Sequence, residues 1–167
     1  SKQVKKLKAD VGIAYDGDAD RCLMVDENGE LVDGDQIMAI SSLVLKSEDK
    51  LKNNTLVGTV MSNLGLVKFC EQNDIHFEAT KVGDRYVLEE MIKSGACIGG
   101  EQSGHIILFD HNTTGDGLIS AIALLCILKE SGKKLSELKK EITILPQVLV
   151  NVKVKNEYKK KLTTIKE

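Results

Sequence analysis

Residues 11–21 read Val-Gly-Ile-Ala-Tyr-Asp-Gly-Asp-Ala-Asp-Arg, and this stretch decides the predicted fold. The apolar and small residues at 11–15 predict a buried β-strand. Carboxylates then follow at every second position, as Asp16, Asp18 and Asp20. Open α/β sheets bind their ligands beyond the carboxyl ends of their strands. The stretch therefore predicts an α/β fold with a polar site at the end of this strand.

The spacing of the acids predicts a metal site. The small spacers Gly17 and Ala19 allow the backbone to curl until the carboxylates face one point. Two carboxylates about 4 Å apart repel by roughly 4 kcal/mol at an effective dielectric constant of about 20, so they need a cation or must take up protons. A set of oxygen ligands suits Mg²⁺, with substrate phosphate or water completing its shell. The alternative is a polar loop whose acids point into solvent.

An EF-hand would also place acids at these positions, but the rest of the loop excludes it. Its sixth position requires glycine, and this chain has Arg21 there. The flanking segments 11–15 and 22–26 look like strands, and Asn28-Gly29 predicts a tight hairpin turn, whereas an EF-hand lies between two helices.

Strand-like and helix-like segments alternate along the rest of the chain, which predicts an α/β sheet with helical crossovers. Asp33 or Asp35 is expected to cap the first long helix, and Thr114 or Asp116 the last one. Predicted strands lie at 55–60, 75–80, 96–98, 105–109 and 148–154. Predicted helices lie at 37–44, 63–72, 85–93, 114–131 and 136–140.

Composition excludes several classes of protein. The net charge of −2 gives no basic field for nucleic acid. No apolar run reaches the length of a membrane span. The four cysteines are widely spaced in apolar contexts and are predicted to be reduced core residues, which favours a cytoplasmic protein.

A second polar cluster reads Gly-Glu-Gln-Ser-Gly-His at residues 100–105. Glu101, Ser103 and His105 place a carboxylate, a hydroxyl and an imidazole within one turn. This set can bind adjacent sugar hydroxyls, and His105 can exchange a proton near neutral pH. The alternative is a glycine-rich connection in which His105 caps a carbonyl group.

A third cluster lies at residues 80–85, where a predicted strand meets a predicted helix. Lys81 and Arg85 could hold a phosphate or stabilise an oxyanion, aided by the helix N-terminus. Taken alone, the cluster favours the simpler interpretation of an Asp84–Arg85 surface pair and a solvated lysine. Asp116 is likewise more typical of a helix cap than of a binding residue.

Together, the three clusters closely resemble the α-D-phosphohexomutase superfamily. The matching motifs are Asp-Gly-Asp-Ala-Asp-Arg at 16–21, Lys-Val-Gly-Asp-Arg-Tyr at 81–86 and Gly-Glu-Gln-Ser-Gly-His at 100–105. Within that superfamily, Val-Met-Ser-Asn-Leu-Gly at 60–65 and Asn-Thr-Thr-Gly-Asp-Gly at 112–117 are similar to the bacterial phosphoglucosamine mutases. The resemblance covers most of the chain and implies a mixed-sheet, three-layer α/β domain with stubs of neighbouring domains.

The resemblance implies an enzyme that interconverts glucosamine 6-phosphate and glucosamine 1-phosphate through a phosphoserine and a bisphosphate, for cell-wall precursor synthesis. Asp16, Asp18 and Asp20 would hold Mg²⁺ beside the phosphoserine, and Arg21 would neutralise nearby charge. Lys81 and His105 would be candidates, with Arg21, for catalytic roles. The implied substrate-binding residues are Glu101, Ser103, His105, Gly83, Asp84 and Arg85.

By the same analogy, residues 1–29 would end the second domain of such an enzyme, 30–143 would form the third, and 144–167 would lead into the fourth. The serine loop and the phosphate-binding loop of the superfamily have no counterpart here. We therefore expect this chain alone to be inactive, to need the missing domains as partners, and to form a homodimer if the strand at 148–154 pairs with a copy.

Three other functions remain open at this point. The chain could derive from a phosphomannomutase or phosphoglucomutase, which share the acid loop and the Glu101 cluster. It could be a haloacid-dehalogenase-like phosphatase with Asp16 as nucleophile, or a sugar-binding module that needs no Mg²⁺. The later clusters fit these alternatives less well than the glucosamine enzyme.

Overall fold

The computed structural model describes residues 1–150 and residue 153. Its larger sheet has four strands in the order β5-β4-β6-β7. Strand β4 pairs in parallel with both β5 and β6, whereas β6 and β7 are antiparallel. The strands are β4 (Thr55–Thr59), β5 (His76–Thr80), β6 (Ile98–Gly100) and β7 (Ile106–Leu108). The predicted α/β class with a mixed sheet is confirmed.

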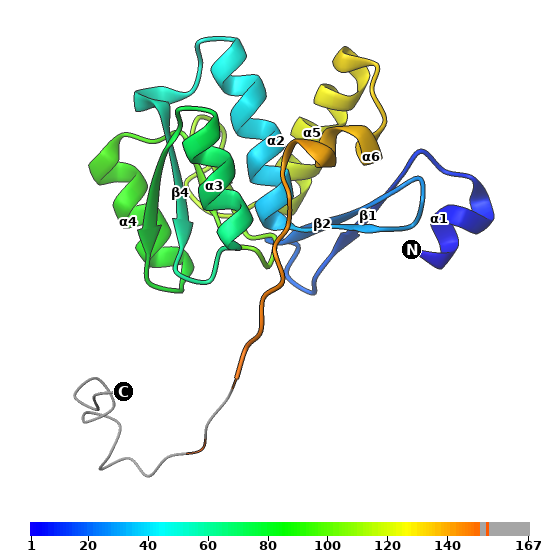
Figure 1. The fold of residues 1–167 in the computed structure, drawn as a ribbon, viewed down its shortest axis with the longest axis horizontal. Helices are drawn as coiled ribbons and strands as arrows, with labels where there is room; N and C mark the ends of the chain where they lie inside the picture. Colours follow the sequence, from blue (N-terminus) through cyan, green and yellow to red (C-terminus); the bar gives the residue numbers. More distant parts are fainter. Residues whose placement is uncertain (151–152, 154–167) are drawn as a thin grey trace.

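Helices cover both faces of this sheet, which gives the predicted three layers (Figure 1). Adjacent residues of β4 point to opposite faces, so Leu56 joins a core with α2, α3 and α5, and Val57 joins a second core with α4. The helices are α2 (Gly34–Ser47), α3 (Leu64–Gln72), α4 (Asp84–Ser94), α5 (Gly117–Ser131) and α6 (Leu135–Leu138), with short 3₁₀ turns η1 (Lys52–Asn54) and η2 (Lys139–Glu141).

Side-chain caps fix where the long helices begin. Asp33 forms a capping box with Gln36 at the start of α2, so the first of the two predicted caps is the one used. Asn63 caps α3, and Asp116 caps α5 by accepting a hydrogen bond from the Ile119 N–H group. Asp116 is therefore a helix cap in the structure, as its sequence context indicates.

The N-terminal segment forms a separate antiparallel sheet, which corrects one expectation. Helix α1 (Lys2–Leu7) precedes β1 (Val11–Tyr15), which pairs with β2 (Cys22–Asp26), and β2 pairs with β3 (Leu31–Val32). Strand β1 is at the edge of this sheet, and its residues are half-buried or exposed, not buried as predicted. The acids therefore follow a hairpin strand and not a strand of the parallel sheet. The tight turn at Asn28-Gly29 is confirmed, with Gly29 at a φ of 76°.

Three further expectations differ from the structure. Strand β6 is displaced toward residues 99–100, because these glycines pair with β7 instead of forming a loop. Residues 148–150 have no regular structure, and the remaining part of the predicted strand at 148–154 lies outside the described residues except for Lys153. Cys126 is exposed on α5, whereas the other cysteines are buried as expected. In the described part of the chain, no helix is long and apolar enough to cross a membrane.

Candidate active site

The loops that follow the parallel strands meet at one edge of the larger sheet. Two of the predicted clusters, at 81–83 and 101–105, lie in these loops because β5 and β6 run in the same direction. The acid loop at 16–21 reaches the same edge from the N-terminal sheet, where Arg21 forms a β-bridge with His105. The structure thus brings the three clusters to a common edge.

The backbone of the acid loop curls through Ala19. This residue has a φ of 59°, and its N–H group donates to the Asp16 carbonyl at 3.4 Å. The Ala19 carbonyl in turn accepts a hydrogen bond of 2.9 Å from the N–H group of Gly117, the first residue of α5. A Cβ atom at Gly117 would lie 2.8 Å from the Ala19 oxygen, so glycine allows this close contact. The acid loop is therefore held against the α/β unit.

The three carboxylates do not face one point, contrary to the expectation. Asp16 lies 3.8 Å from the Arg21 guanidinium, and Asp20 lies 3.7 Å from Nε2 of His105. Among the described residues, no three acidic, histidine or cysteine side chains are close enough to share a metal ion. Like charges repel, and two of these acids have turned toward separate partners.

The chemistry of the acid loop nevertheless fits a hard divalent cation. Its donors are carboxylate oxygens alone, as Mg²⁺ prefers. The side chains of Asp16 and Asp20 are 39% and 38% exposed, so they are free to change rotamer without repacking the core. We therefore keep Asp16, Asp18 and Asp20 as the residues that would hold a metal ion.

The Glu101 cluster is a tight connection between β6 and β7. The Glu101 N–H group donates to the His105 carbonyl, and Gly104 donates back to the Glu101 carbonyl, both at 3.0 Å. The Gly104 carbonyl accepts from the Cys22 N–H group, which joins this connection to β2 beside the acid loop. Gly104 has a φ of 94°, and a Cβ atom there would lie 2.3 Å from the Cys22 oxygen. Only glycine fits this position.

His105 faces the acid loop and not the solvent. It is 2% exposed, and its Nε2 atom points toward Asp20, while Nδ1 has no hydrogen-bond partner among residues 1–150 and 153. A Cβ atom at Gly115 would lie 2.4 Å from the His105 ring, so the imidazole packs directly on that glycine. Ser103, by contrast, is exposed at the tip of the connection. The cluster thus presents Ser103 outward and His105 toward the acids.

Glu101 also links this cluster to the third one. Its Oε1 atom accepts a hydrogen bond of 3.0 Å from the Gly83 N–H group, and Gly83 has a φ of 132°. Lys81 places its ammonium group 5.9 Å from the centroid of the Tyr86 ring, within the range of a cation–π contact. The loop at 81–83 is therefore oriented by Glu101 and Tyr86.

Arg85 is not directed into this site. Its Nε atom lies 2.7 Å from Glu89, one turn along α4. Asp84 accepts a hydrogen bond from the Arg85 backbone N–H group at 2.7 Å. These contacts agree with the simpler interpretation, in which Asp84 and Arg85 lie on the solvent-exposed surface of α4.

Sequence reasoning missed a buried carboxylate behind the site. Asp35 is fully buried in the first turn of α2, and its Oδ2 atom accepts a hydrogen bond of 2.6 Å from the Asn63 N–H group. Burial raises the pKa of Asp35 to about 6, although the hydrogen bond from Asn63 opposes the change. The sequence contains one hint of this, because two acids, Asp33 and Asp35, stand at the start of the same helix. Only one of them can cap it, so the other is a candidate for a buried or functional position.

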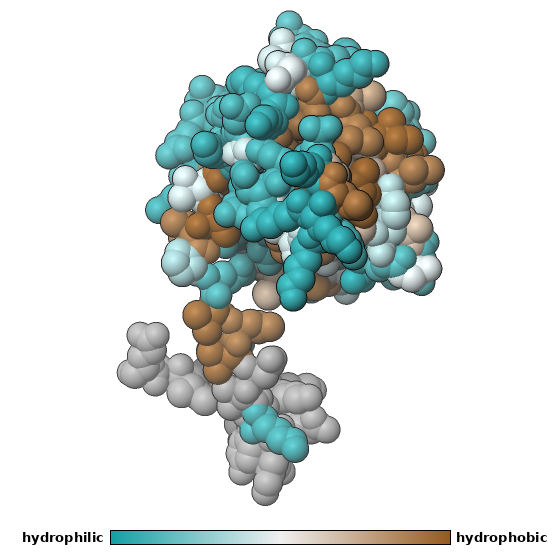
Figure 2. Space-filling model, turned by 90° about the vertical axis from the view of Figure 1, so that its right-hand side faces the viewer, coloured by the Kyte–Doolittle hydropathy of each residue, from teal (hydrophilic) through white to brown (hydrophobic). Residues whose placement is uncertain are grey.

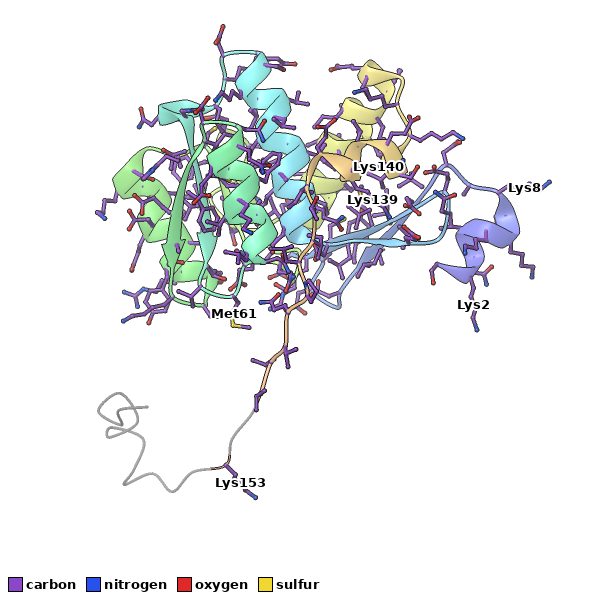
Figure 3. All side chains as sticks on the ribbon, in the orientation of Figure 1. Lys2, Lys8, Met61, Lys139, Lys140 and Lys153 are labelled. Atoms are coloured by element: carbon purple, nitrogen blue, oxygen red, sulfur yellow. The ribbon has the colours of Figure 1, made fainter. Side chains whose placement is uncertain are left out.

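Sequence reasoning also missed Gln147. Its Nε2 atom donates to the Met61 carbonyl at 3.0 Å, and its Oε1 atom accepts at 3.5 Å from the Gln102 side chain. The Asn63 side chain binds the same segment two residues earlier. It accepts a hydrogen bond from the Leu145 N–H group and donates one to the Leu145 carbonyl. Figure 3 shows Met61 at the end of the molecule where this segment crosses. The segment 145–147 thus connects the loops that follow β4 and β6.

Comparison with known proteins shows which family the chain matches. Residues 33–144 match the family model described as phosphoglucomutase/phosphomannomutase, alpha/beta/alpha domain III. The chain is 63% identical over 158 residues to a phosphoglucosamine mutase of Ruminiclostridium cellulolyticum and 61% identical over 156 residues to one of Alkaliphilus oremlandii. These matches cover 95% and 93% of the chain but 35% of each relative, so the chain spans about a third of the length of the curated relatives it matches.

Solved structures give the same picture of the fold. A putative phosphomannomutase from Thermus thermophilus superposes with a TM-score of 0.76 at 26% identity, over 84% of this chain and 32% of that one. The N-acetylphosphoglucosamine mutase of Aspergillus fumigatus, in complex with GlcNAc-6P and magnesium, superposes with a TM-score of 0.68 at 24% identity, over 85% of this chain and 37% of that one. The second likeness concerns the fold alone.

Proposed function

We propose, because this chain belongs to the phosphoglucomutase/phosphomannomutase family, that it forms the acid-loop and sugar-binding part of a phosphoglucosamine mutase. The complete enzyme would interconvert glucosamine 6-phosphate and glucosamine 1-phosphate. The observation that carries the proposal is the meeting of three clusters at one sheet edge, with Asp20 beside His105 and Glu101 bonded to Gly83. Relatives of that name match more than nine-tenths of the chain.

Each cluster has a distinct part in this proposal. Asp16, Asp18 and Asp20 would hold Mg²⁺, which supplies positive charge that stabilises a phosphoryl group during its transfer. Arg21 neutralises negative charge beside the acids. His105 is a positioning residue for Asp20 in this arrangement, and it remains a candidate for proton transfer.

The sugar would lie over the two loops of the larger sheet. Glu101 and Ser103 would accept and donate hydrogen bonds with adjacent sugar hydroxyls, and Lys81 would orient the substrate or stabilise an oxyanion. The implied substrate contacts of Gly83, Asp84 and Arg85 are weaker proposals, since Arg85 pairs with Glu89. Phosphoryl transfer depends mainly on such positioning and charge neutralisation.

Several properties of the whole enzyme belong to the same proposal. The domain boundaries at 1–29, 30–143 and 144–167, a homodimer and a cytoplasmic location are expectations for the longer protein. The phosphomannomutase or phosphoglucomutase alternative differs only in sugar preference. The match to phosphoglucosamine mutases over 95% of the chain argues against the haloacid-dehalogenase-like alternative, because that alternative depends on Asp16, outside the family model at 33–144.

The test is a calorimetric titration of the purified chain with Mg²⁺, followed by glucosamine 1-phosphate, with Asp18→Ala and Glu101→Gln variants. We expect the Mg²⁺ signal to disappear with Asp18→Ala and the sugar signal to weaken with Glu101→Gln. Glucose 1-phosphate and mannose 1-phosphate serve as competitors. Tighter binding of either one than of glucosamine 1-phosphate would favour the alternative enzyme, and sugar binding unaffected by Glu101→Gln would overturn the proposed site.

A further inference from the structure

A cleft of about 1130 Å³ opens away from the candidate active site, between the N-terminal segment and the end of α5. Strand β2 separates the two places: it begins at Cys22, beside the acid loop, and ends at Asp26, beside the cleft. A strand of this length spans roughly 17 Å. The cleft is therefore a second, separate concavity, slightly larger than the roughly 300–1,000 Å³ of typical small-molecule sites.

Lysines gather on both sides of this cleft. Lys5 and Lys8 come from α1 and its end, while Lys129, Lys133 and Lys134 come from the end of α5 and the turn into α6. We call these residues, with the space between them, the lysine cleft. None of the five lysines has an ion-pair partner within the described part of the chain. Their charges are therefore available to an anion.

The lining of the lysine cleft also contains the three acids Asp10, Glu27 and Glu30. Glu27 accepts a hydrogen bond of 2.5 Å from the Ser136 hydroxyl, and Glu30 lies 2.5 Å from the Lys139 ammonium group. Asp10 remains as an exposed acid on the rim. The five lysines outnumber these three acids, so the formal charge of the lining is positive although the whole chain carries a charge of −2.

Lys5 is held in place by the turn between β2 and β3. Its stem passes over Gly29, where a Cβ atom would lie 2.6 Å from the Lys5 Cε atom. Gly29 has a φ of 76°, so the turn itself also requires a residue without a side chain. This packing limits the rotamers of Lys5 and lowers the entropy lost when it binds an anion.

The floor of the lysine cleft is apolar. Val11, Leu125 and Leu128 are each partly exposed in its lining, whereas Leu135, at 1% exposed, lies in the lining without offering appreciable surface. Figure 2 views the side of the molecule that carries α1 and α6, and it shows hydrophobic surface bordered by hydrophilic side chains. A ligand that fills this space therefore needs both negative charge and an apolar part.

We propose that the lysine cleft binds a nucleotide, with the lysines around its phosphates and the leucine floor against its base. Lysine binds phosphate as a point charge and does not require one fixed orientation. The face of a base is apolar and matches the aliphatic floor. An inorganic phosphate would satisfy the lysines alone and leave the floor uncovered.

The test is a titration of the ¹⁵N-labelled 167-residue chain with ADP and, separately, with inorganic pyrophosphate, followed by NMR. Mg²⁺ is left out, so that the acid loop cannot recruit phosphate through a metal ion. We expect saturable shifts at residues 5–11 and 125–135, with ADP bound more tightly than pyrophosphate. Absence of saturable shifts with up to about 5 mM ADP would overturn the proposal. Shifts confined to residues 81–85 would overturn it as well.

Two double variants with the same change in net charge distinguish a specific nucleotide site from nonspecific electrostatic attraction of the anion. The double variant Lys5→Gln/Lys8→Gln should weaken ADP binding about tenfold, since two cations leave the rim. The control Lys2→Gln/Lys6→Gln changes the net charge equally on the same helix but outside the lining, and it should change the affinity less than about twofold. Equal weakening in both variants, or equal affinity for ADP and pyrophosphate, would show nonspecific attraction and refute the nucleotide site.

Discussion

Asp35 is an ionisable residue in an environment that disfavours its charged form. It is an acid with no exposed surface, and its Oδ1 atom has no hydrogen-bond partner among the described residues. Because the pKa is raised, Asp35 keeps its proton in the folded protein between about pH 4 and pH 6, whereas in the unfolded chain it is already ionised in this range. Stability from this residue is therefore greatest at acidic pH, falls as the pH rises through that window, and stays low above it.

We expect Asp35→Asn to stabilise the chain at about pH 7.5, by roughly 3 kcal/mol at most. Asparagine keeps an oxygen for the Asn63 N–H group and removes the buried charge. Urea unfolding at several pH values measures the effect, and the variant should lose most of the fall in stability between about pH 4 and pH 6, the remainder coming from Asp33, whose pKa burial also raises. Asp10→Asn, at an exposed site, is the control and should leave that fall in place. Destabilisation by Asp35→Asn at neutral pH would contradict this account.

Gly104 carries the tight contact between the Glu101 cluster and β2. We expect Gly104→Ala to destabilise the chain by roughly 2 kcal/mol or more, because alanine adds both strain at positive φ and a clash with the Cys22 carbonyl. Thermal unfolding measures the loss. Gly17→Ala is the matched control, since no atom lies within 4 Å of a Cβ placed there and its φ is not positive. Equal effects at the two glycines would be inconsistent with the contact.

At the scale of elements, an ionic cluster joins the end of β2 and the β2–β3 turn to η2. Lys139 lies 2.6 Å from Asp26, which is fully buried, and the same ammonium group also contacts Glu30. Burial acts to raise the pKa of Asp26, but Lys139 and the backbone N–H groups of Glu30 and Asn28 hold it below its usual value. Its stabilising contribution is therefore present at neutral pH and is lost as the pH falls through the lowered pKa.

We expect Lys139→Met to destabilise the chain by about 3 kcal/mol at neutral pH, because it leaves the Asp26 carboxylate buried without its cation. The destabilisation should shrink on acidification, once Asp26 takes up a proton. Lys140→Met, at the exposed neighbouring position, is the control and should have little effect. Urea unfolding at about pH 7 and about pH 4 distinguishes the two variants. A loss of the same size at both values of pH would argue against the ion pair.

Elements with local signals were predictable from the sequence. The candidate caps near residues 33 and 116 and the apolar residues that follow them predicted α2 and α5, and the apolar residues at 63–72 predicted α3. Strand β1 was misassigned as buried, because periodicity reports apolar residues and does not say which sheet a strand joins. The predicted bounds of β6 were too early in the chain, because consecutive glycines at 99–100 are typical of a turn. Their strand conformation depends on pairing with β7, which the local sequence does not show.

At the scale of the whole molecule, β2 is attached to the α/β unit at both ends. Its first residue, Cys22, donates to Gly104, and its last residue, Asp26, pairs with Lys139. The acid loop is further bonded to Gly117 at the start of α5. The N-terminal sheet and the α/β unit are therefore expected to behave as one cooperative unit.

Native-state hydrogen exchange tests this expectation. The amide protons of Cys22 and Gly117 should exchange only by global unfolding, with the same free energy of opening as amides in β4. Lower protection of Cys22 than of β4 would indicate that the N-terminal sheet opens separately. Lys139→Met should lower the protection of all these amides together.

The candidate site was only partly predictable from the sequence, because its contacts cross between sheets. The residue types of the acid loop and the Glu101 cluster predicted the chemistry. The pairing of Asp20 with His105 and of Glu101 with Gly83 depends on three-dimensional packing that no local pattern encodes. Gln147 left no signal, because a single polar residue near Pro146 looks like any exposed residue.

The contacts of Gln147 and Asn63 also determine how far the chain can be shortened from its C-terminal side without loss of the site. The family model ends at residue 144, but hydrogen bonds to the loops after β4 and β6 extend to residue 147. A Cβ atom on Gly65 would lie 2.0 Å from the Thr143 oxygen, so the backbone there already rests against α3. Residues 143–147 have no regular structure and all but Leu145 are exposed, so a protease can reach this segment, and the side chains of Asn63 and Gln147 are what hold it on the loops. Cleavage within this segment would release the support of the Met61 and Gln102 loops, so the shortest piece that keeps the site intact ends after Gln147.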